Sequence, residues 1–298
     1  MTSLQLPLHV SIIGAGRVGT ALAVLFHRCG FRVVSVISRR RQHAERCAAR
    51  VKCPTFSANV ADISRATELL VIAVPDEQIR IVARAVSLQA RLDFDNVAVF
   101  HTSGPVTSDE LDPLRRKGAL AFSLHPIQSF PKEVPLEPQI KLLRGISYGI
   151  EGTPQAIRFG RKLVAKLGGS VVVVPKKEKI LYHLACVLAS NYPVVLLSAV
   201  EEAVTPFIRP PRLRYFERLI ETSIRNAIQH SPRRALTGPI ARGSSRIIDA
   251  HMRALKRNSL LQDVYRALGR YAARKTGRTG GLTKRQRRAI NRILSERG

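Results

Sequence analysis

The 298-residue sequence has few cysteines, few acidic residues and no long uninterrupted apolar run. Its four cysteines form no CxxC pair and no histidine-rich cluster accompanies them, so neither a structural zinc site nor a disulfide framework is expected. No stretch reaches the roughly 18–20 consecutive apolar residues that span a bilayer, and the N-terminus shows no signal-peptide pattern. We therefore expect a cytoplasmic protein that does not enter a membrane.

The shortage of acidic residues leaves a large positive charge. The chain holds 49 Lys and Arg against 21 Asp and Glu, a formal net charge of +28. The charge is concentrated in residues 151–298, and residues 270–298 contain ten basic residues against one acidic. Such a charge attracts polyanions, including nucleic acid, without specifying a fold. An anionic substrate or an arginine-rich proteome is the alternative explanation.

A glycine-rich motif follows the first β-rich segment, residues 9–13. Gly14, Gly16 and Gly19 have the GxGxxG spacing, in which the first glycine permits a tight turn, the second lets the backbone approach a pyrophosphate and the third lets helix and strand pack closely. Apolar residues then recur at helical spacing, and the N-terminus of such a helix offers N–H groups to phosphates. The alternative is a tight turn without a ligand. The predicted cofactor-binding residues here are Gly14, Ala15, Gly16, Arg17, Val18 and Gly19.

The next β-rich segment, residues 33–37, ends in Ser38 and three arginines. An NAD enzyme places an acidic residue at this position against the ribose 2′-hydroxyl, whereas arginine suits a 2′-phosphate. We therefore predict NADP as the cofactor, with Ser38 and Arg39 as phosphate contacts. A solvated basic turn is the alternative. Residues 68–76 then read as a buried strand that places Val74 and Pro75 on the cofactor side.

Two more strand-like segments, residues 96–104 and 119–126, end in polar residues. Because ligands bind beyond the carboxyl ends of the strands in open α/β sheets, Ser103 and His125 are predicted near the nicotinamide. A structural role for His125 and a turn-capping role for Ser103 are the alternatives. Residues 146–150 and 170–174 extend the sheet.

The second half of the chain has a helical pattern. Residues 178–204 predict one long, mostly buried helix on which His183 and Asn191 can share a face. Polar groups on such a helix are costly unless paired, either in a substrate pocket or as a hydrogen-bonded core pair. The loop of residues 236–245 predicts an anion contact through Thr237, Gly238 and Arg242, although Arg242 is equally consistent with a solvated side chain. From residue 270 onward we expect a flexible or partly helical basic tail.

Six blocks carry a family resemblance: IIGAGRVG, AVPD, HTSG, LHPIQSF, YHLACVLASNY and LTGPIARG followed by HMRAL. Over about residues 8–268 the chain resembles the bacterial family that joins a Rossmann-like NADP-binding domain to a domain of unknown function numbered 2520, often labelled NADP- or coenzyme F420-dependent oxidoreductases. That family is similar to pyrroline-5-carboxylate reductase and to 6-phosphogluconate, hydroxyacid and prephenate dehydrogenases.

The resemblance implies an α/β fold with an N-terminal Rossmann doubly wound parallel sheet, followed by an all-helical C-terminal domain of the 6-phosphogluconate-dehydrogenase-like type that forms a homodimer. We expect a Rossmann NADP-binding domain at residues 1–175, a helical substrate and dimerisation domain at 176–268 and a basic tail at 269–298. Hydroxyacid dehydrogenases use a lysine four residues before an asparagine; with Asn191 as that asparagine, Val187 stands at the lysine position. Their acid–base chemistry therefore does not carry over.

The expected function is an NADP-dependent oxidoreductase that transfers a hydride between nicotinamide and a small, anionic carbonyl, imine, hydroxy acid or amino acid. His183 is the first choice for general acid–base and His125 the second, because imidazole exchanges protons near neutral pH. Asn191 and Ser103 would orient the reacting group. The alternative is an NADP-binding sensor or scaffold without turnover, whose basic C-terminal region contacts nucleic acid or an acidic partner. The tail lacks a helix-turn-helix pattern and interleaved aromatics, which disfavours nucleic acid.

Overall fold

The computed structural model describes residues 9–276 and 282–295, and the chain divides into two compact units, Met1–Tyr192 and Pro193–Gly298. The division falls inside the long helix α7 (Lys179–Val204), whose bounds agree closely with the helix predicted at 178–204. The predicted domain boundary after residue 175 lies just before this helix. The two units are described separately below.

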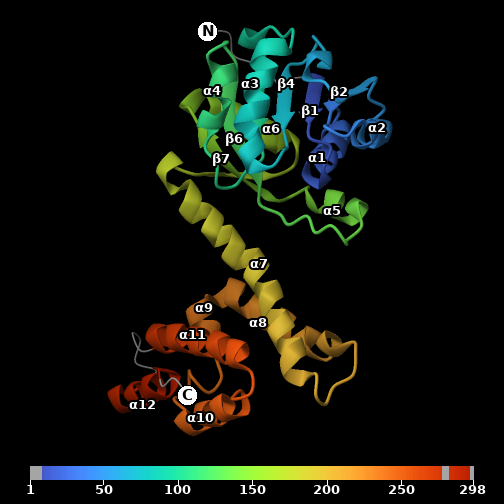
Figure 1. Ribbon diagram of the computed structural model, residues 1–298. Coiled ribbons are helices and arrows are strands. Elements are labelled where there is room, and N and C mark those ends of the chain that lie inside the picture. Colours follow the sequence, from blue (N-terminus) through green and yellow to red (C-terminus); the bar gives the residue numbers. More distant parts are fainter. Residues whose placement is uncertain (1–8, 277–281, 296–298) are drawn as a thin grey trace. The chain divides into compact units, whose positions relative to one another are not determined.

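The first unit is built on one eight-stranded sheet with the order β3-β2-β1-β4-β5-β6-β7-β8 (Figure 1). Its strands are β1 (His9–Ile13), β2 (Arg32–Ile37), β3 (Thr55–Ser57), β4 (Leu69–Ile72), β5 (Ala98–His101), β6 (Leu120–Pro126), β7 (Ser147–Gly152) and β8 (Ser170–Val173). Strands β1 to β6 are parallel, as the Rossmann prediction requires, whereas β7 is antiparallel to β6 and β8 is parallel to β7. Strand β7 runs opposite to β6 because it starts at the edge of the sheet where β6 ends. An antiparallel neighbour of this kind needs no crossover to the other edge.

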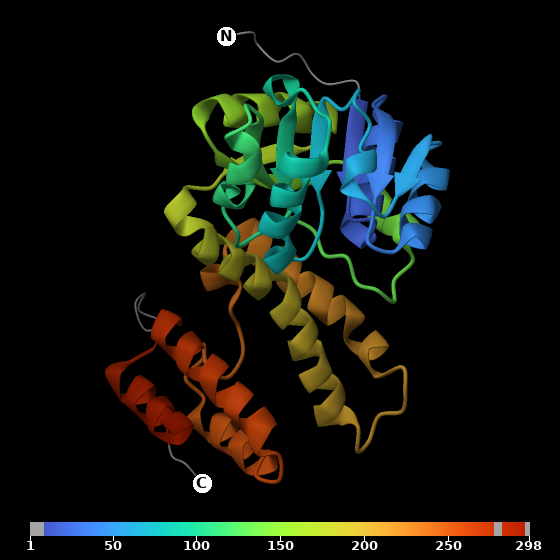
Figure 2. The same cartoon turned by 45° about the horizontal axis from the view of Figure 1, so that its top comes forward.

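Helices cover both faces of this sheet (Figures 1 and 2). Alternate strand residues point to opposite faces, so Val71 belongs to the larger core cluster and Leu70 to the smaller one. The larger cluster includes residues of α1 (Arg17–Arg28), α2 (Arg41–Arg50), α5 (Leu136–Leu142) and α6 (Pro154–Lys166). The smaller cluster includes residues of α3 (Ile79–Gln89) and α4 (Asp112–Arg115). The doubly wound α/β architecture expected from the sequence is confirmed.

The described part of the second unit is all helical, as predicted. Beyond the end of α7 it contains α8 (Glu217–His230), α9 (Pro232–Ala235), α10 (Ser245–Ala254), α11 (Ser259–Thr276) and α12 (Lys284–Ser295). Ile290 and Leu294 of α12 are fully buried against Ile248 of α10. Helix α12 therefore belongs to the core of this unit, and the expected tail boundary at 268 falls inside α11. Arg278 and Arg297, which contribute to the predicted basic tail, lie outside the described residues.

Helix α7 is largely exposed within one chain, so the expectation that it is mostly buried is wrong, and it is unusually apolar for such a helix. By length and composition, residues 176–204 could cross a membrane. The most apolar 18 residues among them have a mean hydropathy of 1.7, and none of these 18 is buried within the chain. A single helix of this kind is weak evidence for a membrane span. From the sequence we expected no membrane-spanning helix because no run of 18–20 consecutive residues is apolar. Helix α7 escapes that criterion because the polar residues Ser190 and Asn191 interrupt its apolar sequence.

Candidate functional site

The three glycines of the turn after β1 meet different surroundings. A Cβ on Gly14, which has φ +98°, would lie 2.2 Å from the Ala73 carbonyl oxygen, and one on Gly19 would lie 1.8 Å from the Gly14 carbonyl oxygen. A Cβ on Gly16 would meet nothing within 4 Å. The fold itself therefore requires Gly14 and Gly19, whereas Gly16 leaves space open at the N-terminus of α1. A dinucleotide pyrophosphate needs such a close backbone approach at this position.

A groove of about 590 Å³ runs over this turn and across the carboxyl ends of β1, β2 and β4. Of the predicted cofactor residues, its lining includes Gly14, Ala15, Gly16, Ser38, Arg39, Val74 and Pro75, and it also includes Arg40 and His43. The open turn fits the pyrophosphate of a nicotinamide dinucleotide.

Three predicted cofactor residues do not line this groove. The Arg17 guanidinium donates instead to the carbonyls of Lys132 and Val134, because the loop before α5 passes over the start of α1. Val18 packs against the larger core cluster, and Gly19 is buried beneath the turn. Any contact of these residues with a cofactor would therefore be through the backbone.

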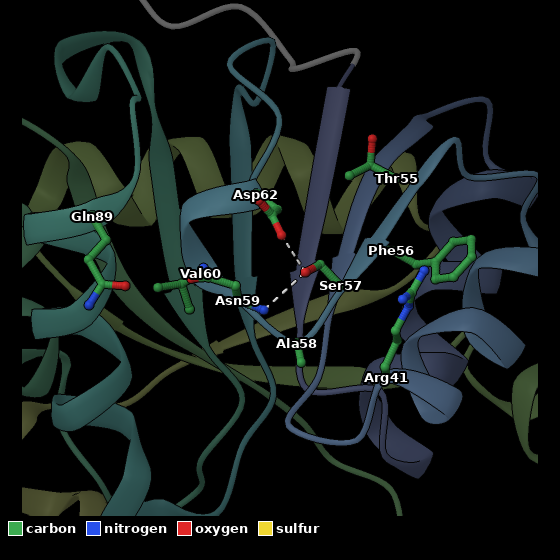
Figure 3. Close-up of a pocket in the computed structure, with 9 residues that line it drawn as sticks. All are labelled: Arg41, Thr55, Phe56, Ser57, Ala58, Asn59, Val60, Asp62 and Gln89. Carbon is green, nitrogen blue, oxygen red and sulfur yellow. Dashed lines mark hydrogen bonds between the residues drawn. The ribbon is translucent and has the colours of Figure 1, made fainter.

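A second pocket, of about 910 Å³, adjoins the groove and shares Ala58 and Val60 with it (Figure 3). The guanidinium of Arg41 lies over the Phe56 ring, 5.6 Å from its centroid. On the other side, Ser57 donates a hydrogen bond to Asp62 and accepts one from the Asn59 backbone N–H at 3.0 Å. The pocket thus extends the arginine-lined end of the groove.

The second part of the site lies at the carboxyl end of β6. The Nδ1 atom of His125 is 2.7 Å from the hydroxyl of Tyr182 on α7. His125 pairs with Gly149 on β7, and a Cβ on Gly149 would lie 2.2 Å from that hydroxyl. The tyrosine can therefore reach His125 only because residue 149 has no side chain.

Gly104, in the loop after β5, leaves room on the other side of the His125 ring, where a side chain would crowd His125 and His183. A Cβ on Gly104 would lie 2.7 Å from Cδ2 of His183 and 3.3 Å from Nε2 of His125. The two imidazole rings are 6.5 Å apart between centroids. The structure therefore brings together the two histidines that the sequence nominated for acid–base chemistry.

Lys179, at the start of α7, is buried beneath this pair. Its Nζ donates to Oγ of Ser123 at 2.7 Å and to the Ser103 carbonyl at 3.4 Å, and it lies 5.9 Å from the centroid of the Tyr182 ring. Burial lowers the pKa of Lys179 to about 8.

His101 stabilises the loop after β5. Its Nδ1 accepts from the Ser103 N–H at 3.2 Å, so its Nε2 donates to the Thr107 carbonyl at 3.1 Å. Burial lowers the pKa of His101 to about 4, which keeps this arrangement neutral. The Ser103 hydroxyl accepts from the Val106 N–H at 3.2 Å. Ser103 thus makes the turn-capping bond considered from the sequence.

The remaining predicted residues lie elsewhere. Asn191 is exposed on α7 and its Oδ1 accepts from the Ser190 hydroxyl at 2.8 Å, so it forms no core pair with His183. Thr237 and Arg242 are exposed on a loop of the second unit, where Gly238 adopts φ +93° and its carbonyl accepts from the Arg242 N–H. Substrate contacts by this loop stay a prediction.

Sequence reasoning missed Lys179, Tyr182 and Ser123. Lys179 belongs to a charged run, KKEK, that directly follows the domain boundary predicted after residue 175. One signal was available: Lys179, Tyr182 and His183 are spaced i, i+3 and i+4, and such residues share a helix face. Ser123 offered no signal, because its role depends on the register that places it opposite His101.

Comparisons with known proteins agree with this arrangement. Residues 3–126 match the Rossmann-like domain family, and residues 146–272 match DUF2520, a domain of unknown function. The chain therefore contains a Rossmann-like domain followed by a DUF2520 domain. A search of curated proteins finds no match.

Solved structures share this two-domain fold. A candidate NADP oxidoreductase from Bacteroides fragilis is 22% identical, with a TM-score of 0.72, and the match covers 90% of this chain and 98% of that one. A protein from Thermotoga maritima is 23% identical, with a TM-score of 0.70 and the same coverage. An imine reductase from Myxococcus stipitatus in complex with NADP⁺ is 14% identical, with a TM-score of 0.60, and the match covers 96% of this chain and all of that one.

Proposed function

We propose that this protein is an NADP-dependent oxidoreductase that acts on a small, anionic carbonyl, imine, hydroxy acid or amino acid. One observation carries the proposal: the glycine-turn groove and the His125 cluster both lie at the carboxyl edge of the parallel strands β1 to β6. This edge is where ligands bind in open α/β sheets. The similarity to an imine reductase that binds NADP⁺ supports the same chemistry.

The bound nicotinamide would supply or accept the hydride, and the chain would bind, orient and protonate the substrate. His183 is the proposed general acid–base, since it is half-buried and faces the space beside Gly104. His125, with Nδ1 engaged by Tyr182, is the second candidate. We also propose that Asn191 and Ser103 orient the reacting group, and that Thr237, Gly238 and Arg242 hold an anionic part of the substrate.

We propose NADP rather than NAD because the groove contains Ser38, Arg39 and Arg40 where an acidic residue would bind a ribose hydroxyl. Arg39 and Arg40 are exposed beside the groove, as phosphate contacts must be. Hydrogen bonds from charged groups contribute about 1.5–3 kcal/mol each. Losing one such bond should weaken binding roughly 10- to 100-fold.

Calorimetry with NADP⁺ and NAD⁺ tests this proposal. The wild-type protein should prefer NADP⁺, and Arg39→Ser should lower that preference while leaving NAD⁺ binding unchanged. Arg158→Ser, at an exposed position on α6, is the matched control and should change neither affinity. Preference for NAD⁺ in the wild type would overturn the assignment. A screen for NADPH oxidation with ketoacids and cyclic imines then identifies the substrate.

We also propose that the protein is a cytoplasmic homodimer in which a second copy covers α7. Apolar side chains of α7, among them Leu181, Leu188 and Val194, are more than half exposed within one chain. A soluble protein rarely leaves so large an apolar surface uncovered. Light scattering should therefore give twice the mass of one chain, and a monomer in solution would contradict the proposal.

The basic second unit favours a second candidate function, an NADP-binding sensor or scaffold that contacts nucleic acid. At about 100° per residue, Arg285, Arg288 and Arg292 lie on the face of α12 opposite the buried Ile290 and Leu294, and Lys284 lies at the edge of that face. All four are exposed, so they form a continuous cationic surface. Phosphate contacts require such a surface.

A further inference from the structure

Lys179 is a buried cation for which the proposed chemistry supplies no role. Its side chain is 1% exposed, and none of the ion pairs among the described residues includes it. Glu151, the buried carboxylate of β7, accepts instead from the N–H and hydroxyl of Ser108, at 2.6 and 3.0 Å. A buried charge costs free energy, so its presence calls for a physical explanation.

The surroundings of His125 supply that explanation. Titratable groups from four elements surround the pair formed by His125 and Lys179. They are Tyr182, His183 and Cys186 of α7, His101 of β5, Glu151 of β7 and Asp76 in the turn after β4. Burial, followed by the charges of Lys179 and His183, lowers the pKa of His125 to about 4. The two carboxylates act on Lys179, whose pKa they raise against the effect of burial.

The bond to Tyr182 decides which nitrogen of His125 carries the proton. Burial raises the pKa of Tyr182, so the phenol keeps its proton, and its hydroxyl lies 2.7 Å from Nδ1 of His125, a contact in which either atom can be the donor. We take the phenol as the donor and Nδ1 as the acceptor. A neutral imidazole has one donor and one acceptor nitrogen. The proton of His125 then lies on Nε2, the atom that faces Gly104.

We propose that Lys179 is a positioning residue whose charge, together with the burial of the ring, keeps His125 a neutral imidazole. Tyr182 holds the ring proton on Nε2, and this N–H donates a hydrogen bond to the carbonyl oxygen or imine nitrogen of the substrate. A neutral imidazole can polarise a carbonyl without losing its proton. A bound NADPH would supply the hydride for the substrate carbon, and His183 would supply the one proton that the oxygen or nitrogen then needs. The hydrogen bond to a substrate rests on the proposed function, whereas the protonation state of His125 does not.

Nuclear magnetic resonance of the histidine ring nitrogens tests the proposal without a substrate. His125→Asn identifies the His125 signals by their loss. In the wild type, His125 should stay neutral from pH 8 to pH 5.5, with its proton on Nε2. Lys179→Met removes the charge but keeps an apolar chain of similar length, and it should raise the pKa of His125 by at least half a unit. Lys179→Arg restores the charge and should restore the wild-type titration.

Lys162→Met, at an exposed position on α6, removes one lysine far from the cluster and should leave His125 unchanged. An unchanged titration of His125 in Lys179→Met would overturn the proposal, as would a wild-type His125 that is charged at pH 6 or protonated at Nδ1. If Lys179→Met does not fold, Lys179→Gln, which removes the charge but keeps a polar group near Ser123, gives the same comparison with the wild type.

The same experiment separates this inference from the proposed function. A protein that binds no NADP⁺ yet shows the Lys179 effect on His125 would contradict the oxidoreductase proposal alone. NADP⁺ binding with no such effect would contradict only the role of Lys179. Once a substrate is found, Lys179→Met should lower kcat and add an acidic limb to its pH profile, while the Kd for NADPH stays unchanged.

Discussion

The hydroxyl of Tyr182 lies 2.7 Å from Nδ1 of His125, directly over the glycine that pairs with that histidine in the sheet. The contact joins the first turn of α7 to the carboxyl end of β6. It depends on Gly149, because any side chain there would occupy the position of the hydroxyl. The histidine, the tyrosine and the glycine therefore act as one unit.

Gly149→Ala should break this unit. The added Cβ would lie 2.2 Å from the hydroxyl oxygen, so Tyr182 must move away from His125. Overpacking of this kind costs about 1–3 kcal/mol of the free energy of unfolding, which urea titration measures. Adding Gly149→Ala to Tyr182→Ala should cost much less, because the clash is already gone. Equal costs in both backgrounds would show that the two residues do not interact.

The glycines of the turn after β1 should respond differently to the same substitution. Gly16→Ala should abolish most NADP⁺ binding with little change in stability, because its Cβ meets only open space where the pyrophosphate is proposed. Gly19→Ala should instead lower the unfolding free energy, because its Cβ would collide with the Gly14 carbonyl. Calorimetry and urea titration separate the two effects. Undiminished binding by Gly16→Ala would argue against a dinucleotide at this turn.

His183→Ala should abolish turnover and leave the affinity for NADPH nearly unchanged, because the imidazole is proposed to exchange a proton with the substrate and to make no cofactor contact. General acid–base groups typically contribute about 100- to 10,000-fold to the rate. Single-turnover oxidation of NADPH measures the loss, and fluorescence titration measures the affinity. His230→Ala, at an exposed position on α8, is the control. Undiminished turnover in His183→Ala would exclude this histidine as the acid–base group.

His101 should make stability depend on pH. Burial lowers its pKa in the folded state to about 4, from an ordinary value of 6.5. Between these values the unfolded chain binds the proton and the folded chain does not. The stabilisation is therefore complete above pH 6.5 and is lost as the pH falls towards 4, by about 3 kcal/mol in total. Urea titrations from pH 7 to 4.5 should show a shallower pH dependence for His101→Asn than for the wild type; parallel curves would contradict this prediction.

The cationic face of α12 gives a test of the nucleic-acid alternative. Lys284, Arg285, Arg288 and Arg292 point away from the core, so replacing all four with glutamine should leave the helix folded. If the surface binds DNA, this variant should bind more weakly and with a smaller salt dependence, by about 0.9 in log–log slope per lost phosphate contact.

The matched control replaces four exposed basic residues of α6, Arg158, Arg161, Lys162 and Lys166, with glutamine. Equal weakening by both variants would mean that net charge alone attracts DNA. No binding by the wild type at low salt would eliminate the alternative.

The sequence by itself determined the features that depend on local pattern. The GxGxxG spacing, the buried strand β4 that precedes Val74 and the helix at Lys179–Val204 all follow from periodicity and glycine placement over short stretches. The sequence nominated His183 and His125 for the same acid–base role, but it indicated no contact between His125 and the helix that carries His183.

Only the tertiary structure decided which polar groups meet. Lys179 reaches Ser123 across 56 positions, and Tyr182 reaches His125 across 57. Those contacts depend on strand register and on the absence of side chains at Gly149 and Gly104, which no local pattern encodes. The reversal of β7 and the inclusion of α12 in a core have the same origin, because each depends on packing between segments far apart in the chain.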